Sequence, residues 1–140
     1  MFDQTITLFN YRISEGAWHA HVFHGVNVLQ QRADTATTQG TDNADAAEFL
    51  LQCDAGQRAE GLQYAPPKAY QALEDASGYF TLTPQADFIA IGAHDADAPV
   101  PESDYAEGLY QTMNELYDGV VQITTAAWFS LLPHFEIGGK

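Results

Sequence analysis

Two segments decide the fold: Gly119-Val120-Val121-Gln122-Ile123-Thr124-Thr125-Ala126-Ala127-Trp128-Phe129 and Pro133-His134-Phe135-Glu136-Ile137. Successive side chains of a β-strand point to opposite faces, so Val121 and Ile123 share one face of the first segment. In the second segment the apolar side chains also occupy every second position. The sequence therefore predicts two strands here, and such a pair is stable only if further strands complete the sheet.

Six earlier segments carry strand signals and are expected to complete this sheet. They are 2–9, 17–23, 26–29, 46–53, 79–82 and 87–92. Between the first two, residues 10–16 predict a hairpin turn. Gly25 is expected to end the second strand, so that the third begins after a bulge or corner. Segment 46–53 is compatible with a helix as well, because a short apolar run does not separate the two, and we prefer a strand.

One helix is expected from about Ser103 to Tyr117, where apolar side chains recur at helical spacing. Ser103 is a suitable N-cap, and Asp104 lies in the first turn, where the helix dipole favours anions. A short second helix is expected to begin at Pro67, because proline suits the first helical position.

These elements predict a mainly β (α+β) fold: a small antiparallel β-barrel or sandwich with one helix and a possible short second one. A chain of 140 residues fits a single domain, 1–140, that buries roughly two thirds of its unfolded surface. It contains no run of about 18 apolar residues that would span a membrane, and no secretory signal begins it. We therefore expect a cytoplasmic site of assembly.

The charge of the chain is strongly negative, with 19 acidic residues against five basic ones and a net charge of −14. No lysine or arginine occurs between Lys68 and Lys140. Binding of nucleic acid depends on basic side chains that neutralise phosphates, so the composition disfavours it. An acidic surface can instead line a passage through which DNA slides, or it can simply keep the chain soluble.

The histidines His19, His21 and His24 are the cluster closest to a metal site, because His-x-His on a strand places both imidazoles on one face. Exposed histidines on an edge strand are the alternative, and we favour it because the motif is short. Asp95 and Asp97 lack the glycine and the distal glutamate of a calcium loop, so they predict a solvated acidic linker. We expect neither a metal nor a cofactor.

No motif of an enzyme is present in the sequence. Gly-x-Ser-x-Gly and phosphate-binding glycine patterns are absent, and Cys53, the only cysteine, lacks the sequence context of a catalytic thiol. We interpret Cys53 as a small buried hydrophobic residue. The sequence thus predicts a protein that is not an enzyme.

The segment 33–45 has no apolar period and is rich in Thr, Asp and Gly, which predicts a mobile loop. Loops of this length in a compact domain are commonly functional, so we expect contact with a partner subunit.

Four segments together resemble small virion proteins of long-tailed bacteriophages, in particular the minor capsid or head-completion proteins called head-to-tail stoppers. They are Thr5-Ile6-Thr7-Leu8-Phe9-Asn10, Tyr64-Ala65-Pro66-Pro67-Lys68-Ala69-Tyr70, Asp87-Phe88-Ile89-Ala90-Ile91-Gly92 and Pro133-His134-Phe135-Glu136-Ile137-Gly138-Gly139. The order of motifs in that family is followed from Tyr79 to Gly139, and more loosely from Phe2. The acidic helix and the Thr-rich loop depart from the pattern.

The resemblance implies a non-enzymatic structural protein: a β-barrel with a helix that assembles as a ring in the head-to-tail connector of a bacteriophage. Its partners would be other copies of itself, the portal or adaptor protein and tail proteins, with DNA only passing through and no membrane. It would reside in the virion, assembled in the bacterial host cytoplasm. Segments 33–45 and 93–102 would dock to neighbouring rings. Their interaction residues would be Thr35, Thr37, Thr38, Gly40, Asp42, Asp95, Asp97 and Glu102.

Two alternatives remain at this point. A tail terminator or another tail protein would form a ring as well. A small β-barrel that binds a ligand or a metal through His19, His21 and the aromatic residues belongs to a different class, as does a hydrolase of unknown type.

Overall fold

The computed structural model describes residues 4–30, 47–94, 96 and 98–140. The interaction residues predicted in the loops, apart from Glu102, therefore lie outside the described residues. They are Thr35, Thr37, Thr38, Gly40, Asp42, Asp95 and Asp97. Within the described residues, no helix is long and apolar enough to cross a lipid bilayer.

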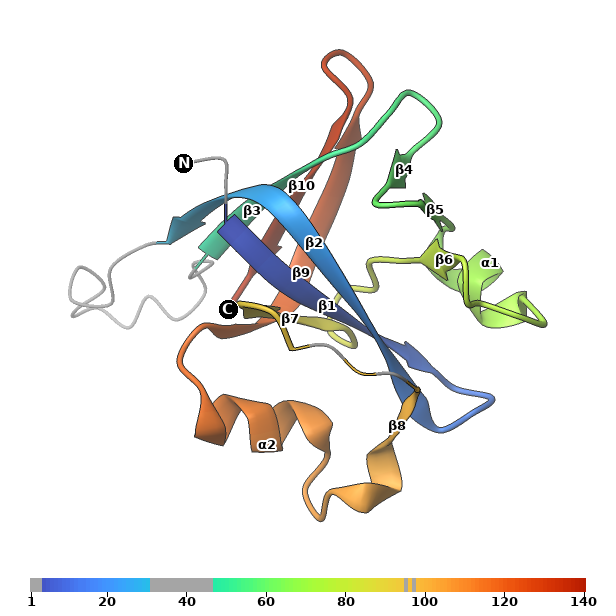
Figure 1. Ribbon diagram of the computed structural model, residues 1–140, viewed down its shortest axis with the longest axis vertical. Coiled ribbons are helices and arrows are strands. Elements are labelled where there is room, and N and C mark those ends of the chain that lie inside the picture. Colours follow the sequence, from blue (N-terminus) through green and yellow to red (C-terminus); the bar gives the residue numbers. More distant parts are fainter. Residues whose placement is uncertain (1–3, 31–46, 95, 97) are drawn as a thin grey trace.

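The fold is mainly β, with a closed antiparallel barrel of six strands (Figure 1). The barrel order is β1-β7-β9-β10-β3-β2, and pairing of β1 with β2 closes the ring. The strands are β1 (Gln4–Arg12), β2 (Ala17–Gln30), β3 (Ala47–Gln52), β7 (Phe88–Ile91), β9 (Val120–Phe129) and β10 (His134–Gly139). A short strand β8 (Val100–Pro101) pairs with the beginning of β2. The predicted fold class is confirmed.

A small three-stranded sheet and a helix lie beside the barrel, at the right of Figure 1. The sheet consists of β4 (Arg58–Ala59), β5 (Leu62–Tyr64) and β6 (Tyr79–Phe80). The helix α1 (Pro67–Ala72) connects β5 to β6 and begins at Pro67, as predicted. The predicted strand 79–82 is thus shorter than expected and belongs to this sheet.

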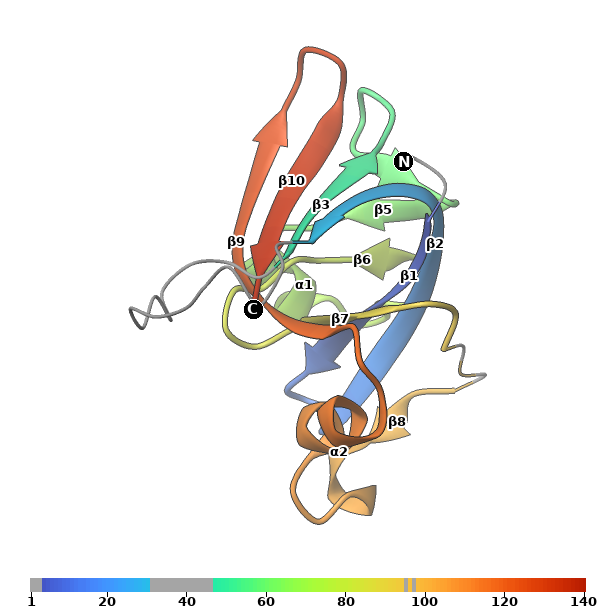
Figure 2. The same ribbon diagram turned by 90° about the vertical axis from the view of Figure 1, so that its left-hand side faces the viewer.

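The strand β2 is continuous over 14 residues, so the prediction of two strands divided at Gly25 is wrong. Gly25 adopts a φ of 70°, a left-handed conformation that glycine tolerates. The β1–β2 ladder shifts register beside it, between the pairs Gln4–Val26 and Ile6–Phe23, so the predicted bulge is present within the continuous strand. The first part of β2 pairs with β1 up to Val26, and the part from Asn27 to Gln30 pairs with β3. One bent strand therefore belongs to both sides of the barrel (Figure 2).

The helix α2 (Leu109–Leu116) is present but begins later than predicted. Ser103 lies in a preceding 3₁₀-helix, η2 (Glu102–Asp104), and the N-cap residue of α2 is Gly108. Oε1 of Glu102 accepts hydrogen bonds from the backbone N–H of Leu109 (3.0 Å) and from Nε1 of Trp18 (2.7 Å). A side chain seven residues upstream thus satisfies one of the free N–H groups at the start of the helix.

The interior contains two large apolar clusters, on the two sides of the strands. The first fills the barrel around Phe23, Phe80 and Phe135, and the second lies under α2 around Trp18 and Phe88. In β10, Phe135 and Ile137 point into the first cluster, as the alternation predicted. The side chains of the same strand that point outward belong to the surface described next.

Candidate interaction site

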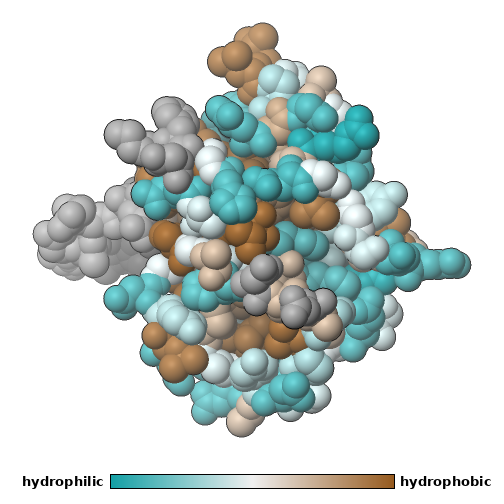
Figure 3. All heavy atoms as spheres, in the orientation of Figure 1, coloured by the Kyte–Doolittle hydropathy of each residue, from teal (hydrophilic) through white to brown (hydrophobic). Residues whose placement is uncertain are grey.

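The β9–β10 hairpin extends beyond the rest of the barrel and stands at the top of Figure 1. The last paired residues are Phe129 and His134, so the turn consists of residues 130–133. Leu131 is 86% exposed, Leu132 82% and Phe129 42%. The brown side chains at the upper end of Figure 3 lie over this hairpin. An apolar group of this kind at a projecting tip is typical of a protein–protein contact.

The conformation of the hairpin is fixed by His134. Its ring stacks on Phe129 with centroids 5.2 Å apart and an interplanar angle of 11°. Its Nδ1 lies 2.7 Å from the carbonyl oxygen of Leu132, and its Nε2 lies 3.0 Å from Oε2 of Glu136. Both partners are acceptors, and the hydrogen bond to the Leu132 carbonyl, followed by that to Glu136, raises the pKa of His134. The tip is therefore presented in a defined shape.

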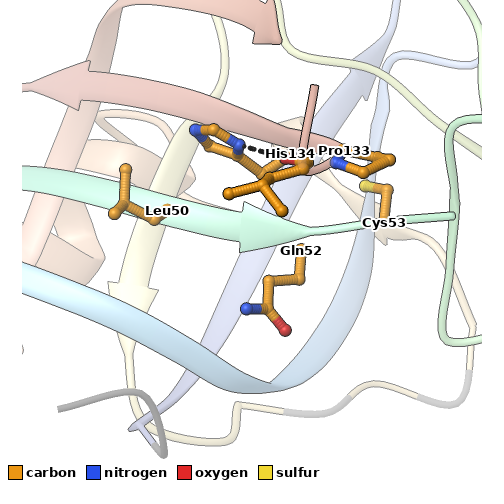
Figure 4. Close-up of a pocket in the computed structure, with 6 residues that line it drawn as sticks. Leu50, Gln52, Cys53, Pro133 and His134 are labelled. Carbon is orange, nitrogen blue, oxygen red and sulfur yellow. Dashed lines mark hydrogen bonds between the residues drawn. The ribbon is translucent and has the colours of Figure 1, made fainter. Parts of the chain in front are cut away.

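A pocket of about 500 Å³ lies between the turn end of this hairpin and the end of β3 (Figure 4). Its lining residues are Leu50, Gln52, Cys53, Leu132, Pro133 and His134. Burial, followed by the charge of Asp54, raises the pKa of the Cys53 thiol to about 11. The thiol is therefore protonated at neutral pH and a poor nucleophile. Cys53, interpreted from the sequence as a small buried hydrophobic residue, is partly buried and packs against the apolar cluster that fills the barrel.

A second mostly apolar pocket, of about 530 Å³, lies where β1 ends beside α1. Its lining residues are Tyr11, Ile13, Pro67, Lys68, Gln71, Thr83, Ala86 and Asp87. Ile13 is 71% exposed. Gln71 holds α1 to the end of β1, since its Oε1 accepts a hydrogen bond from the N–H of Ile13 (3.0 Å) and its Nε2 donates one to the carbonyl of Tyr11 (2.7 Å).

Asp87 is the one buried carboxylate at this second pocket, and its oxygens are used within the fold. They accept hydrogen bonds from Nδ2 of Asn10 (2.9 Å), the N–H of Tyr11 (3.0 Å) and the N–H of Thr83 (3.1 Å). Burial raises the pKa of Asp87 to about 6, against the opposing effect of these hydrogen bonds. A carboxylate with a raised pKa beside a pocket is a usual candidate for acid–base chemistry. Here the carboxylate instead holds β1 against the turn before β7, because its hydrogen-bond donors come from these two segments.

The structure brings His19 and His21 to one pocket, of about 430 Å³, together with Glu15 and Asp75. Nε2 of His19 lies 2.9 Å from Oε1 of Glu15. His21 is partly buried, and desolvation, with a smaller effect of the charge of His19, lowers its pKa to about 4. His21 is therefore neutral at pH 7, and its Nε2 has no hydrogen-bond partner among the described residues.

His24 is separate from this pair. Its backbone N–H donates to Oε2 of Glu60 (2.9 Å), and its ring lies 3.3 Å from the same oxygen. Among the residues that the structure describes, no group of three or more His, Cys, Asp or Glu side chains is placed to hold a metal ion. The three histidines therefore do not converge there. No acidic partner for them was evident from the sequence, but the structure places Glu15 beside His19 and Glu60 beside His24.

Glu102 is the predicted interaction residue that the structure describes. One of its oxygens is engaged with Trp18 and with the start of α2, so the side chain contributes to folding. The sequence interpretation also missed the hairpin tip. The sequence does contain a signal for it, the turn Ser130-Leu131-Leu132-Pro133. Turns between strands are normally polar, so two leucines there indicate an exposed apolar site.

The comparisons with known proteins give one match. The model of a family of unknown function matches residues 1–140, the whole of the chain. No curated protein and no solved structure matches it significantly.

Proposed function

We propose that the chain, which belongs to the family of unknown function DUF6751, is a non-enzymatic structural protein that assembles with other copies of itself into a ring. The observation that carries the proposal is the projecting hairpin tip, where Leu131 and Leu132 are exposed. Apolar side chains at a projecting position gain free energy when a neighbouring subunit covers them.

The particle we propose is the virion of a tailed bacteriophage, with the ring in the head-to-tail connector as a head-completion, stopper-like protein. The portal or adaptor ring and tail proteins would be its partners, and the ring would assemble in the bacterial host cytoplasm. Two features support this assignment: the resemblance of the four sequence segments, which implies a β-barrel with a helix, and the net charge of −14. A negative ring lets DNA pass without binding it. A tail terminator is the alternative in the same class.

The test uses a phage, or an induced prophage, that carries the gene. A nonsense mutation in the gene is expected to abolish infectivity and to leave heads that lose their DNA or do not join tails, as seen by electron microscopy. Mass spectrometry of purified wild-type virions is expected to detect the protein at several copies per particle. Infectious particles formed without the protein would refute the proposal.

A ligand-binding barrel is the second candidate, and the pocket of His19 and His21 favours it. Nε2 of His21 is buried in a site that also contains Glu15 and Asp75. Zinc or nickel bound there raises the melting temperature of the protein by mass action. An unchanged melting temperature at millimolar metal would remove this candidate in its metal-binding form.

A further inference from the structure

We infer that the hairpin tip of one copy inserts into the second apolar pocket of the next copy, so that the subunits join head to tail. The tip is Phe129, Leu131 and Leu132. The socket is the pocket of Tyr11, Ile13, Pro67, Lys68, Gln71, Thr83, Ala86 and Asp87. The inference rests on the proposed assembly into a ring and names the two surfaces that form it.

Charge distribution favours the hairpin as the element that approaches another copy. Residues 119–135 contain no Asp, Glu, Lys or Arg and form the longest such run, 17 residues between Asp118 and Glu136. Two copies that each carry a net charge of −14 repel each other over most of their surface. A neutral apolar tip meets the least repulsion. Recognition of a basic partner would require acidic side chains at the tip, and residues 119–135 contain none. The tip therefore favours an apolar partner surface.

The socket is suited to receive an apolar tip from an acidic chain. The side chains of Asp87 and Gln71 are engaged within the fold, since both hydrogen-bond to β1, whereas Oγ1 of Thr83 is buried without a hydrogen-bond partner among the described residues. Ile13 extends its apolar lining outward. Lys68 is one of only five basic residues, and it is exposed at the rim of this pocket. Its charge offsets part of the repulsion between the two copies.

The positions of tip and socket determine the type of assembly. The β9–β10 hairpin stands at the top of the molecule in both views, and the turn between β1 and β2 lies in the lower half (Figures 1 and 2). A contact between two different surfaces of identical subunits leaves a free tip and a free socket on every dimer. It therefore repeats, and gives a closed ring when the rotation between subunits closes.

Disulfide cross-linking tests the contact in the full-length protein. Cys53→Ala removes the only cysteine, and Leu131→Cys with Lys68→Cys then places one thiol on the tip and one at the rim of the socket. At about 0.5 mM protein under mild oxidation, we expect a ladder of covalent oligomers on a non-reducing gel. Either cysteine alone is expected to give no ladder. The matched control, Leu131→Cys with Asn114→Cys on the exposed face of α2, is expected to stay monomeric.

Two results would overturn the inference. Dimers from Leu131→Cys alone, at the yield of the double variant, would show that tips meet tips. A double variant that stays monomeric would show that the socket does not receive the tip. Circular dichroism melting curves of each variant confirm that it is folded. The ladder is read from isolated protein and the proposed function from particles, so the failure of one is distinguishable from the failure of the other.

Discussion

The side-chain amide of Asn10 donates a hydrogen bond of 2.9 Å to the carboxylate of Asp87, and both side chains are fully buried. Nδ2 of Asn10 also donates a hydrogen bond to the carbonyl oxygen of Thr81 (2.7 Å). In return, the backbone N–H of Thr81 donates one to Oδ1 of Asn10 (3.0 Å). Two side chains thus connect β1 to segments more than 70 residues away. The barrel wall and the socket depend on this connection.

The first prediction concerns Asp87→Asn. The substitution replaces an acceptor by an NH₂ group that faces the donors from Asn10, Tyr11 and Thr83. We expect a loss of about 1–3 kcal/mol in the free energy of unfolding, measured by urea denaturation. Asp118→Asn, at an exposed position, is the control and is expected to change stability by less than about 0.5 kcal/mol. Equal stability of the two variants would contradict the assigned role of Asp87.

The second prediction concerns the pH dependence of stability, to which Asp87 and His21 contribute with opposite signs. The pKa of Asp87 rises from its ordinary 3.8 to about 6, so the folded state binds more protons over this range. Its contribution to stability is complete below pH 3.8 and is lost as the pH rises through 6. The pKa of His21 falls from 6.5 to about 4, so its contribution is complete above pH 6.5 and is lost as the pH falls through 4.

Single variants separate the two effects. As the pH rises from 4 to 6, Asp87→Asn is expected to gain stability relative to wild type. As the pH rises from 4 to 6.5, His21→Gln is expected to lose stability relative to wild type. Each change amounts to at most about 3 kcal/mol, from 1.36 kcal/mol per pKa unit. Urea denaturation at half-unit pH steps measures it. A variant whose profile is parallel to that of wild type would show that its residue does not titrate in this range.

The third prediction concerns close packing at Gly139. A Cβ at this position would lie 2.6 Å from Cγ1 of Val121 and 2.7 Å from the carbonyl oxygen of Gln122. We expect Gly139→Ala to destabilise the protein by about 1–3 kcal/mol, because the backbone of β9 must move. A Cβ at Gly78 would meet no atom within 4 Å, so Gly78→Ala is the matched control and is expected to be neutral or slightly stabilising. Thermal denaturation of both variants checks this.

The fourth prediction separates the role of the hairpin tip from that of the core. Leu131→Ser with Leu132→Ser is expected to change the free energy of unfolding by less than about 0.5 kcal/mol per residue, because both side chains are exposed. Sedimentation velocity should show that the same variant no longer self-associates. Phe135→Ala, in the core beside Trp128, is expected to cost about 3–5 kcal/mol. A tip variant that associates like wild type would remove the tip from the interface.

The fifth prediction concerns the Cys53 thiol. Burial raises its pKa from 9.0 to about 11, so the thiolate fraction at pH 8 is about 100-fold smaller in the folded protein than in the unfolded chain. Alkylation by iodoacetamide, followed by mass spectrometry, should therefore be slower in buffer than in 8 M urea by about this factor. Similar rates in the two conditions would indicate a reactive thiolate in the folded protein.

The sequence predicted those elements whose signal is local. The alternation in 119–137 gave β9 and β10 with their buried faces, and Pro67 marked the start of α1. It did not predict that β2 continues through Gly25, because the pairing with β3 that keeps it extended is not local. The later start of α2 had a similar cause, since the orientation of Glu102 depends on Trp18, 84 residues away.

The candidate site was less accessible from sequence than the fold. The exposure of Leu131 and Leu132 depends on how far the hairpin extends beyond its neighbours, which no pattern in the hairpin itself reveals. The spacing of His19 and His21 did predict one shared face, and the structure places both in one pocket. Their acidic neighbour Asp75 approaches through the tertiary fold.

The position of β10 in the barrel has a consequence for the growing polypeptide. This strand, His134–Gly139, lies between β9 and β3, so both neighbours have an unpaired edge until it has been synthesised. Exposed strand edges recruit other chains. A ribosome that stalls before it has translated His134–Gly139 would therefore release an open sheet that tends to aggregate, and holdase chaperones would act on this protein until that strand emerges.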